Sequence, residues 1–276
     1  MNIYRALGSI HANFLKNGDL HTTVMHNTYD KFAKNSSAED VAFMNYGYHS
    51  LDVSEESPVL DPKDEIHRYP IQLYHKAVSG IDLEGKALLE VGSGRGGGAN
   101  TIKKYLNVES IVGIDLSGEA VNLANRDFGG EGIQFEEGNA YSLPFDDNSF
   151  DVVLNVESSH CYTQFGNFLS EVQRVLRPGG HFMYTDFRIT KDIMNVRNHL
   201  NATDLEIVLY EDISSNVVKA LDLDTYRRLE MMERTNFSPM EKKKLYYMSG
   251  VKGTAMYRDF VLGVRTYYRY ILKKTG

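Results

Sequence analysis

Short apolar runs rich in β-branched residues alternate with helical patterns between residues 86 and 188. Such alternation is typical of β-α-β units arranged around a parallel sheet. The apolar runs predict five strands: Ala87–Val91, Ser110–Asp115, Ile133–Glu136, Phe150–Glu157 and Gly180–Phe187. The stretches between them predict helices over Ala99–Tyr105, Gly118–Arg126 and Phe165–Val175. The sequence Leu176-Arg177-Pro178-Gly179-Gly180 should end the last helix and turn the chain, because proline and paired glycines cannot continue a helix.

Two further zones flank this central alternation. Residues 1–85 mix helical and turn-rich stretches and are expected to form a helical N-terminal cap, or substrate segment. After residue 189, the pattern predicts strands over Leu205–Tyr210 and Tyr267–Lys273, with helices over Asn216–Glu233 and Pro239–Met248 between them. Methionine and tyrosine concentrate in this last third, where they suit either an ordinary core or an adaptable lid over an apolar substrate. We therefore expect a main domain over 86–276, with 211–256 as a lid insertion.

Composition places the chain among soluble globular proteins. Its 276 residues are 42% hydrophobic and 24% charged, which excludes a disordered or collagen-like chain. A net charge of −7 argues against broad binding to nucleic acid or an anionic membrane, although it leaves room for a local basic patch. No apolar run is long enough to span a bilayer, and the first residues lack the apolar core of a secretory signal. The expected location is the cytoplasm.

Cysteine and histidine usage gives no sign of a metal site. Cys161 is the single cysteine, so the chain can form neither an internal disulfide nor a multi-cysteine zinc site. The nine histidines show no close spacing typical of metal ligands. We expect no metal.

The most informative stretch runs from Leu88 to Gly98, where a predicted strand leads through five glycines and an arginine into a helix. Glycines allow a sharp turn and a close approach of backbone to a ligand, and the N-terminus of the following helix attracts an anionic group. Gly92, Gly94 and Gly97 also satisfy the dinucleotide pattern GxGxxG, so a nicotinamide cofactor stays open at this point. Asp115, at the end of the next strand, suits the ribose hydroxyls of either cofactor.

Five motifs in order make the sequence resemble the class I S-adenosylmethionine-dependent methyltransferases. The motifs are Glu90-Val91-Gly92-Ser93-Gly94-Arg95-Gly96, Asp115, Glu137-Gly138-Asn139-Ala140, Asn155-Val156-Glu157-Ser158-Ser159-His160 and Leu176-Arg177-Pro178-Gly179-Gly180. The dinucleotide alternative predicts neither the Asn139 segment nor the last motif. The resemblance implies a doubly wound α/β fold, with a seven-stranded, mostly parallel, Rossmann-like sheet, N-terminal helices and a helical lid insertion. It also implies S-adenosyl-L-methionine as the cofactor.

The same resemblance assigns cofactor contacts to individual residues. Glu90, Gly92, Ser93 and Gly94 would face the methionyl part, with Asn155 near its amino group, and Asp115 would bind the ribose. Leu116, Asn139 and Ala140 would flank adenine. Many members of the family carry Asp where this chain has Asn139, whose amide oxygen accepts a hydrogen bond without the assistance of charge.

A narrower resemblance extends outside the central zone. Four segments are similar to bacterial small-molecule methyltransferases, such as the phthiotriol dimycocerosate group and terpenoid C-methyltransferases: Asn45-Tyr46-Gly47-Tyr48, Arg68-Tyr69-Pro70-Ile71-Gln72-Leu73-Tyr74, Glu157-Ser158-Ser159-His160-Cys161-Tyr162 and Tyr184-Thr185-Asp186-Phe187-Arg188. The similarity implies a hydrophobic acceptor. Its expected contacts are Tyr46, Tyr48, Gln72 and Tyr162.

His160 and Glu157 are the candidate catalytic residues. A hydroxyl acceptor needs a base, and a histidine just beyond strand four, next to the expected cofactor, suits that task. Glu157 is the second candidate for a chemical role, or it tethers the N-terminal region. The expected reaction is methyl transfer to a hydroxyl, or to a carbon, of a hydrophobic natural product or lipid-like molecule. Alternatives are C-methylation of a prenyl or terpenoid acceptor with or without cyclisation, and an NAD(P)-dependent reductase.

The polar N-terminal stretch, about residues 1–34, precedes the core without an obvious strand. We expect it to reach a neighbouring subunit of a homo-oligomer and to help close that subunit's site.

Overall fold

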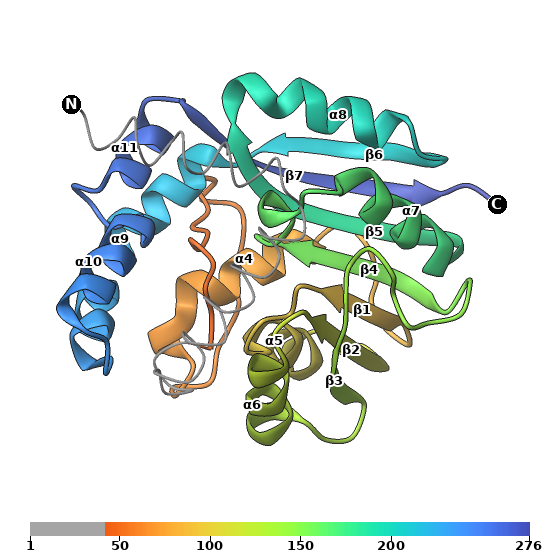
Figure 1. Ribbon diagram of the computed structural model, residues 1–276, viewed down its shortest axis with the longest axis horizontal. Coiled ribbons are helices and arrows are strands. Elements are labelled where there is room, and N and C mark those ends of the chain that lie inside the picture. The colour runs from red at the N-terminus through yellow and green to blue at the C-terminus, as the bar shows by residue number, and fades with distance from the viewer. Residues whose placement is uncertain (1–41) are drawn as a thin grey trace.

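The computed structural model describes residues 42–276, so the prediction made for residues 1–34 lies outside the described part of the chain. Figure 1 shows a central twisted sheet flanked by helices. The sheet has seven strands in the order β3-β2-β1-β4-β5-β7-β6. Strands β1 to β5 pair in parallel, whereas β7 runs antiparallel to both β5 and β6. The strands are β1 Ala87–Val91, β2 Ser110–Asp115, β3 Ile133–Glu137, β4 Phe150–Val156, β5 Leu176–Ile189, β6 Leu205–Asp212 and β7 Arg265–Lys274.

Helices cover both faces of the sheet. The α-helices of the described residues are α4 Arg68–Val78, α5 Gly97–Tyr105, α6 Gly118–Phe128, α7 Phe165–Val175, α8 Ile193–Asn201, α9 Ser214–Arg234, α10 Pro239–Met248 and α11 Ala255–Val261. Short 3₁₀ turns lie at η1 Glu65–His67, η2 Ser159–Cys161 and η3 Thr190–Asp192. The seven-stranded α/β architecture expected from the sequence is therefore confirmed. Alternate strand residues serve the two faces because successive side chains of a strand point in opposite directions.

Two hydrophobic clusters separate along those faces. On one face, β1 residue Leu88 packs in a cluster with side chains of α4, α5, α6, α9 and α11. On the other, Leu89 packs in a cluster with α7 and α8, where Phe168 is fully buried. Strands buried on both faces explain why the sequence shows nearly continuous apolar runs rather than strict alternation.

Several boundaries differ from the predicted ones. Arg177 to Gly180 do not simply turn the chain: β5 already pairs at Leu176 with Phe150, and the next pair is His181 with Val152, so these four residues form a bulge within the strand. Gly179, at φ +80°, takes the left-handed conformation that the bulge requires. Strand β4 ends at Val156, because Glu157 turns into the left-handed region at φ +44°. Helices α8 and α11 were not predicted.

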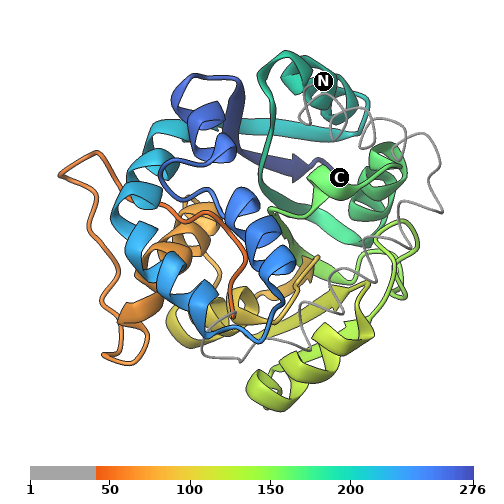
Figure 2. The same ribbon diagram turned by 60° about the vertical axis from the view of Figure 1, so that its left-hand side comes forward.

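The insertion between β6 and β7 contains α9, α10 and α11, and Figure 2 shows α9 and α10 next to α4. A buried arginine attaches it to the segment before α4. Arg228 of α9 contacts Asp224 at 2.9 Å and donates to the carbonyl of Asn45 at 2.8 Å. The predicted insertion over 211–256 thus lies beside the N-terminal segment, and its action as a lid stays a prediction. Over residues 42–276, no helix has the length and apolar character to cross a bilayer.

Candidate active site

The loop between β1 and α5 has a backbone that glycine alone accommodates well. Gly92, Gly94 and Gly96 adopt φ values of +80°, +53° and +80°. A Cβ atom on Gly92 would lie 2.0 Å from Ser158 Oγ, and one on Gly96 would lie 2.6 Å from the Phe135 ring. Other residues cannot enter such spaces without displacing their neighbours. The N–H groups of Gly92 and Ser93 both donate to the carbonyl of Ile114, at 2.8 and 3.0 Å, which ties the loop to β2.

Asp115 lies at the tip of β2, directly beside this loop. Its two carboxylate oxygens accept hydrogen bonds from the N–H of Gly94 at 2.8 Å and of Ser117 at 2.9 Å. The cap of α6 is Ser117, whose hydroxyl accepts from the N–H of Ala120 at 3.1 Å. Asp115 is therefore not the helix cap, and its carboxylate is held where the sequence places a ribose-binding acid.

Glu90 lies beneath the loop, fully buried in β1. Tyr74 of α4 donates to its Oε1 at 2.8 Å. Burial raises the pKa of Glu90 to about 8, against the opposing effect of the hydrogen bonds from Tyr74 and the Ala99 amide. The contact joins α4 to the strand that carries the glycine loop.

Asn155, in β4, presents a polar group toward the same region. Its amide nitrogen donates to the carbonyl of Val91 at 2.8 Å, while its Oδ1 is buried without a hydrogen-bond partner within residues 42–276. Ser93 Oγ is likewise buried without a hydrogen-bond partner within residues 42–276. Tyr162 completes this side, since its hydroxyl contacts Ser158 Oγ at 2.8 Å and lies 3.4 Å from the Asn155 amide.

The residues expected to flank adenine lie after β2 and β3. Asn139 is exposed, and its Oδ1 accepts from the N–H of Tyr141 at 2.9 Å. One lone pair of the oxygen expected to bind adenine is therefore used in a hydrogen bond within the local turn. Ala140 and Leu116 are half-buried. Their role toward adenine stays a prediction.

His160 is held by Asp186, which lies in the neighbouring strand β5. Asp186 Oδ1 lies 2.8 Å from Nδ1 of the imidazole, and its Oδ2 accepts from the backbone N–H of His160 at 2.9 Å. Arg188 contacts the same carboxylate at 3.0 Å. Ser159 donates to Asp186 Oδ2 at 2.7 Å. The His160 ring packs on Phe187, with ring centroids 4.4 Å apart.

Charge in this cluster favours a protonated imidazole. Burial lowers the pKa of His160, but the negative potential of Cys161 and Asp186 outweighs it and holds that pKa well above its ordinary value. Burial acts to raise the pKa of Asp186, yet Arg188 and His160 keep it far below its usual range. The fully buried aspartate is therefore charged and faces two cations.

Glu157 connects three distant segments. Its Oε1 accepts from the N–H of Tyr46 at 2.6 Å and from the hydroxyl of Tyr267 in β7 at 2.7 Å. Burial raises the pKa of Glu157 to about 7, although these two hydrogen bonds and the charge of His160 oppose the rise. The tethering role that the sequence left open for Glu157 is thus present in the structure, together with a carboxyl group that titrates near neutral pH.

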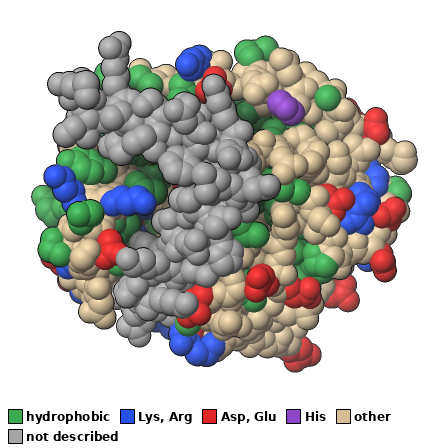
Figure 3. Space-filling view, viewed as in Figure 1, with side chains coloured by type: hydrophobic (Ala, Val, Ile, Leu, Met, Phe, Trp, Pro, Cys, Tyr) green, Lys and Arg blue, Asp and Glu red, His purple; other side chains and the backbone are tan. Residues whose placement is uncertain are grey.

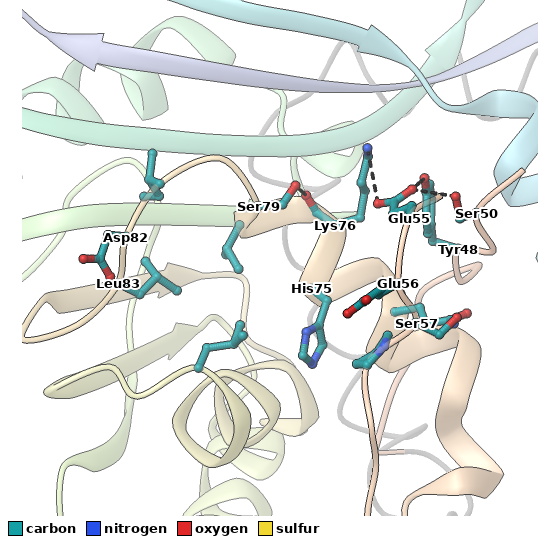
Figure 4. Close-up of a pocket in the computed structure, with 15 residues that line it drawn as sticks. Tyr48, Ser50, Glu55, Glu56, Ser57, His75, Lys76, Ser79, Asp82 and Leu83 are labelled. Atoms are coloured by element: carbon teal, nitrogen blue, oxygen red, sulfur yellow. Dashed lines mark hydrogen bonds and ion pairs between the residues drawn. The ribbon is translucent and has the colours of Figure 1, made fainter. Parts of the chain in front are cut away.

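The four expected substrate contacts do not gather in one place. Tyr46 and Tyr162 lie at the Glu157 and Gly92 side, as their hydrogen bonds show. Tyr48 and Gln72 instead line a cavity of about 410 Å³ beside α4. In Figure 4, Tyr48, Ser50, Glu55 and Lys76 gather at one end of this cavity, with Asp82 and Leu83 at the other. None of the expected cofactor contacts lines it.

Two residues that shape the site escaped the sequence analysis in this role. Asp186 orients His160, and Tyr267 binds Glu157. Asp186 comes close to His160 because β4 and β5 pair in parallel, which puts an acid near the end of β5 next to the residues after β4. Tyr267 gave no sequence signal, because its approach depends on the insertion of β7 next to β5.

The residues at this edge fit S-adenosylmethionine. A glycine cradle in which a Cβ would collide, a carboxylate fixed at the adjacent strand tip, and two buried polar atoms without a partner in residues 42–276 are what such a cofactor needs. We find no cluster of metal-ligating side chains in the described part of the chain.

Replacing Gly92 by alanine should weaken cofactor binding and destabilise the protein by more than the roughly 1–2 kcal/mol of left-handed strain alone. The added Cβ would meet Ser158 as well. Calorimetry and chemical unfolding measure both effects. Gly85→Ala is the control, because Gly85 has φ +66° with no atom near its Cβ position. The double variant Gly92→Ala/Ser158→Gly should recover part of the loss, and equal behaviour of Gly92→Ala and Gly85→Ala would contradict the collision.

Comparisons with known proteins agree with this geometry. Residues 89–184 match the family model of a methyltransferase domain. The chain is 43% identical over 187 residues to a fatty-acid O-methyltransferase of Mycolicibacterium smegmatis, which covers 67% of this chain and 66% of that protein. It is 35% identical over 255 residues to a phthiotriol/phenolphthiotriol dimycocerosates methyltransferase of Mycobacterium tuberculosis (H37Rv), covering 89% and 90% of the two chains.

Solved structures share the fold. The cyclase SpnF superimposes with a TM-score of 0.70 at 19% identity, over 92% of this chain and 97% of that one. Geranyl diphosphate C-methyltransferase from Streptomyces coelicolor, solved with S-adenosyl-L-homocysteine, has a TM-score of 0.64 at 15% identity, over 92% and 98%. With the glycine cradle, the strand-tip carboxylate and these relatives together, the chain belongs to the S-adenosylmethionine-dependent methyltransferases.

Proposed function

We propose that this methyltransferase acts on a lipid-like acceptor and that the methylated atom is an oxygen of a long-chain carboxylic acid. The observation that carries the proposal is the His160–Asp186–Arg188 cluster. In it, two cationic side chains surround the single buried carboxylate of Asp186. The 43% identity to a fatty-acid O-methyltransferase and the 35% identity to a phthiotriol methyltransferase support a lipid-like acceptor. The reductase alternative is wrong for this chain, given its family.

When bound, S-adenosylmethionine supplies a methyl group on a positively charged sulfur, which leaves readily when a nucleophile attacks. The protein therefore works chiefly by positioning and by excluding water. The glycine loop and Asp115 would hold the cofactor, with Asn155 Oδ1 and Ser93 Oγ as further polar contacts.

His160 would bind the acceptor. Because its Nδ1 is held by Asp186, an acceptor would meet the ring at Nε2, in competition with the Cys161 side chain that also bonds His160. The protonated ring would donate to a carboxylate oxygen. A fatty acid is already ionised at neutral pH, so its oxygen needs no base. Glu157 offers little repulsion to such an anion, because burial raises its pKa to about 7.

A hydroxyl acceptor is the second candidate. The pairing of an orienting aspartate with a histidine is an arrangement suited to general-base catalysis, in which Nε2 takes the proton of the hydroxyl. This role needs His160 neutral, whereas the carboxylate role needs it charged. The two candidates therefore predict opposite effects of pH.

The pH dependence of kcat/KM should separate them. Because the pKa of His160 lies well above 6.5, activity on a carboxylate should be fully present near neutral pH and fall as pH rises through that pKa. With a hydroxyl acceptor, activity should rise over the same range. Initial rates with a long-chain fatty acid and the matching fatty alcohol measure this. His160→Gln should remove the step at the pKa of His160 and leave any step near pH 7 that comes from Glu157, whose pKa burial raises to about 7. A profile that His160→Gln leaves unchanged would refute both roles.

The support for carbon methylation and for cyclisation comes from solved structures at 19% identity or less, and such a likeness shows the fold alone. Detection of S-adenosylhomocysteine together with a methyl ester supports the proposal. Turnover of an acceptor without S-adenosylhomocysteine would favour cyclisation instead.

A further inference from the structure

Helix α10 presents an unusual outward face. Met240, Lys243, Lys244 and Tyr247 follow one another at the helical spacing i, i+3, i+4 and i+7, and all four are exposed. Met240 and Tyr247 have 82% and 43% of their surface exposed. The helix has no buried residue, yet it begins with a complete capping box between Ser238 and Glu241 and a proline at its start. Its inward side is half-buried at Glu241, Lys242, Leu245 and Tyr246, so the opposite side is left to solvent.

The two lysines of this face are available to an outside partner. Lys242, on another side of α10, pairs with Glu233 at 3.4 Å, but Lys243 and Lys244 form no ion pair within residues 42–276. Two unpaired cations flanked by Met and Tyr form a basic, apolar stripe on a chain whose net charge is −7. Figure 3 shows hydrophobic and basic side chains adjoining one another on the left of the molecule, over the region of α9 and α10.

The stripe ends at the candidate active site. Met248, the last residue of α10, is 49% exposed, and its carbonyl accepts from the hydroxyl of Tyr46 at 2.8 Å. The N–H of the same tyrosine donates to Glu157 at 2.6 Å. One tyrosine therefore joins the end of the exposed stripe to the carboxyl group beside His160.

We propose that α10 docks this enzyme on the surface of an anionic phospholipid bilayer. Lysines of an interfacial helix attract anionic headgroups, while methionine and tyrosine side chains enter the boundary between headgroups and acyl chains. Docking through α10 would place Tyr46 and Glu157 near the surface from which a lipid-like acceptor is drawn. The inference goes beyond the proposed function and rests on it in one respect: the acceptor is lipid-like.

Vesicle co-sedimentation of the full chain tests this directly. The protein should bind vesicles made of equal parts phosphatidylglycerol and phosphatidylcholine, and bind pure phosphatidylcholine much more weakly. Lys243→Gln/Lys244→Gln should lower the partition coefficient on the order of 30-fold, because each lysine near an anionic surface contributes about 1 kcal/mol to the binding free energy. Met240→Ser/Tyr247→Ser should lower it on both vesicle types.

The control variant removes equal charge from another exposed helix. Lys191 and Arg197 lie exposed at η3 and α8, far from α10 in Figure 1, so Lys191→Gln/Arg197→Gln should bind like the unmodified chain. Thermal unfolding confirms that each variant is folded. Absence of binding to anionic vesicles, or equal loss in the control, would overturn the proposal. So would light scattering that shows α10 joining two copies of this chain. No acceptor or cofactor is present in this assay. Vesicle binding can therefore be interpreted even if the proposed methyl transfer is not found.

Discussion

Replacing Asp115 by alanine is expected to weaken binding of S-adenosylmethionine at least about 100-fold. A carboxylate that accepts two hydrogen bonds from ribose hydroxyls contributes about 1.5–3 kcal/mol for each. The substitution also removes the acceptor of the Gly94 N–H, at 2.8 Å, so the glycine loop loses one of its attachments to β2 and keeps the two to the Ile114 carbonyl. Isothermal calorimetry with the cofactor and with S-adenosylhomocysteine measures the loss.

Asp115→Asn should show a smaller loss, because the amide keeps one oxygen acceptor but not the charge. The matched control is Asp146→Ala, an exposed acid after β3 that forms no part of the site. Its affinity should equal that of the unmodified chain. If Asp115→Ala also binds with unchanged affinity, Asp115 does not hold the ribose and the cofactor site lies elsewhere.

Replacing Asp186 by asparagine should lower kcat/KM for the acceptor on the order of 100-fold. Removing one partner of a buried charge pair costs about 3–5 kcal/mol of stability. Part of this loss should appear as lower activity, because Asp186 orients His160. The loss of negative charge should also lower the pKa of His160, whose rise depends partly on Asp186. For a carboxylate acceptor, the fall of activity should therefore move to lower pH, and NMR titration of the imidazole should show the same shift.

Asp186→Glu separates charge from orientation. It keeps the anion and hence the raised pKa of His160, but it displaces the two contacts at 2.8 and 2.9 Å. Asp151→Asn is the control, since Asp151 forms a comparable ion pair with Arg177 at 2.8 Å at the opposite end of β4. A pH profile that is the same in Asp186→Asn and the unmodified chain would show that Asp186 supports the fold and nothing more.

Strands β1 and β4 were predictable because each is buried on two faces and leads into a turn with a clear chemical signal. Ala87–Val91 and Ser110–Asp115 match the observed strands, and Phe165–Val175 matches helix α7. The glycines after β1 were found because a required left-handed backbone leaves its mark in the sequence. The acid that ends β2 was found because a carboxylate at the tip of the next strand suits ribose hydroxyls.

The remainder depends on contacts between distant parts of the chain. Helix α8 has a weaker apolar pattern than α7, and α11 has seven residues, too few for a helical period to stand out. Tyr48 and Gln72 were grouped with Tyr46 because all three lie in segments of the narrower resemblance, yet the structure places Tyr48 and Gln72 at a separate cavity beside α4. The partners of Glu157 come from positions 111 and 110 residues away, which local patterns do not reveal.

Those two partners of Glu157 bear on how the enzyme is made. One belongs to the segment before α4, synthesised early, and the other to β7, synthesised much later. A ribosome-bound chain that has released residues 89–184 holds the glycine loop but not the tyrosine of β7 that binds Glu157. Catalytic competence should thus arise only after β7 has left the ribosome, and a fragment trimmed to residues 89–184 should bind cofactor poorly and turn over nothing.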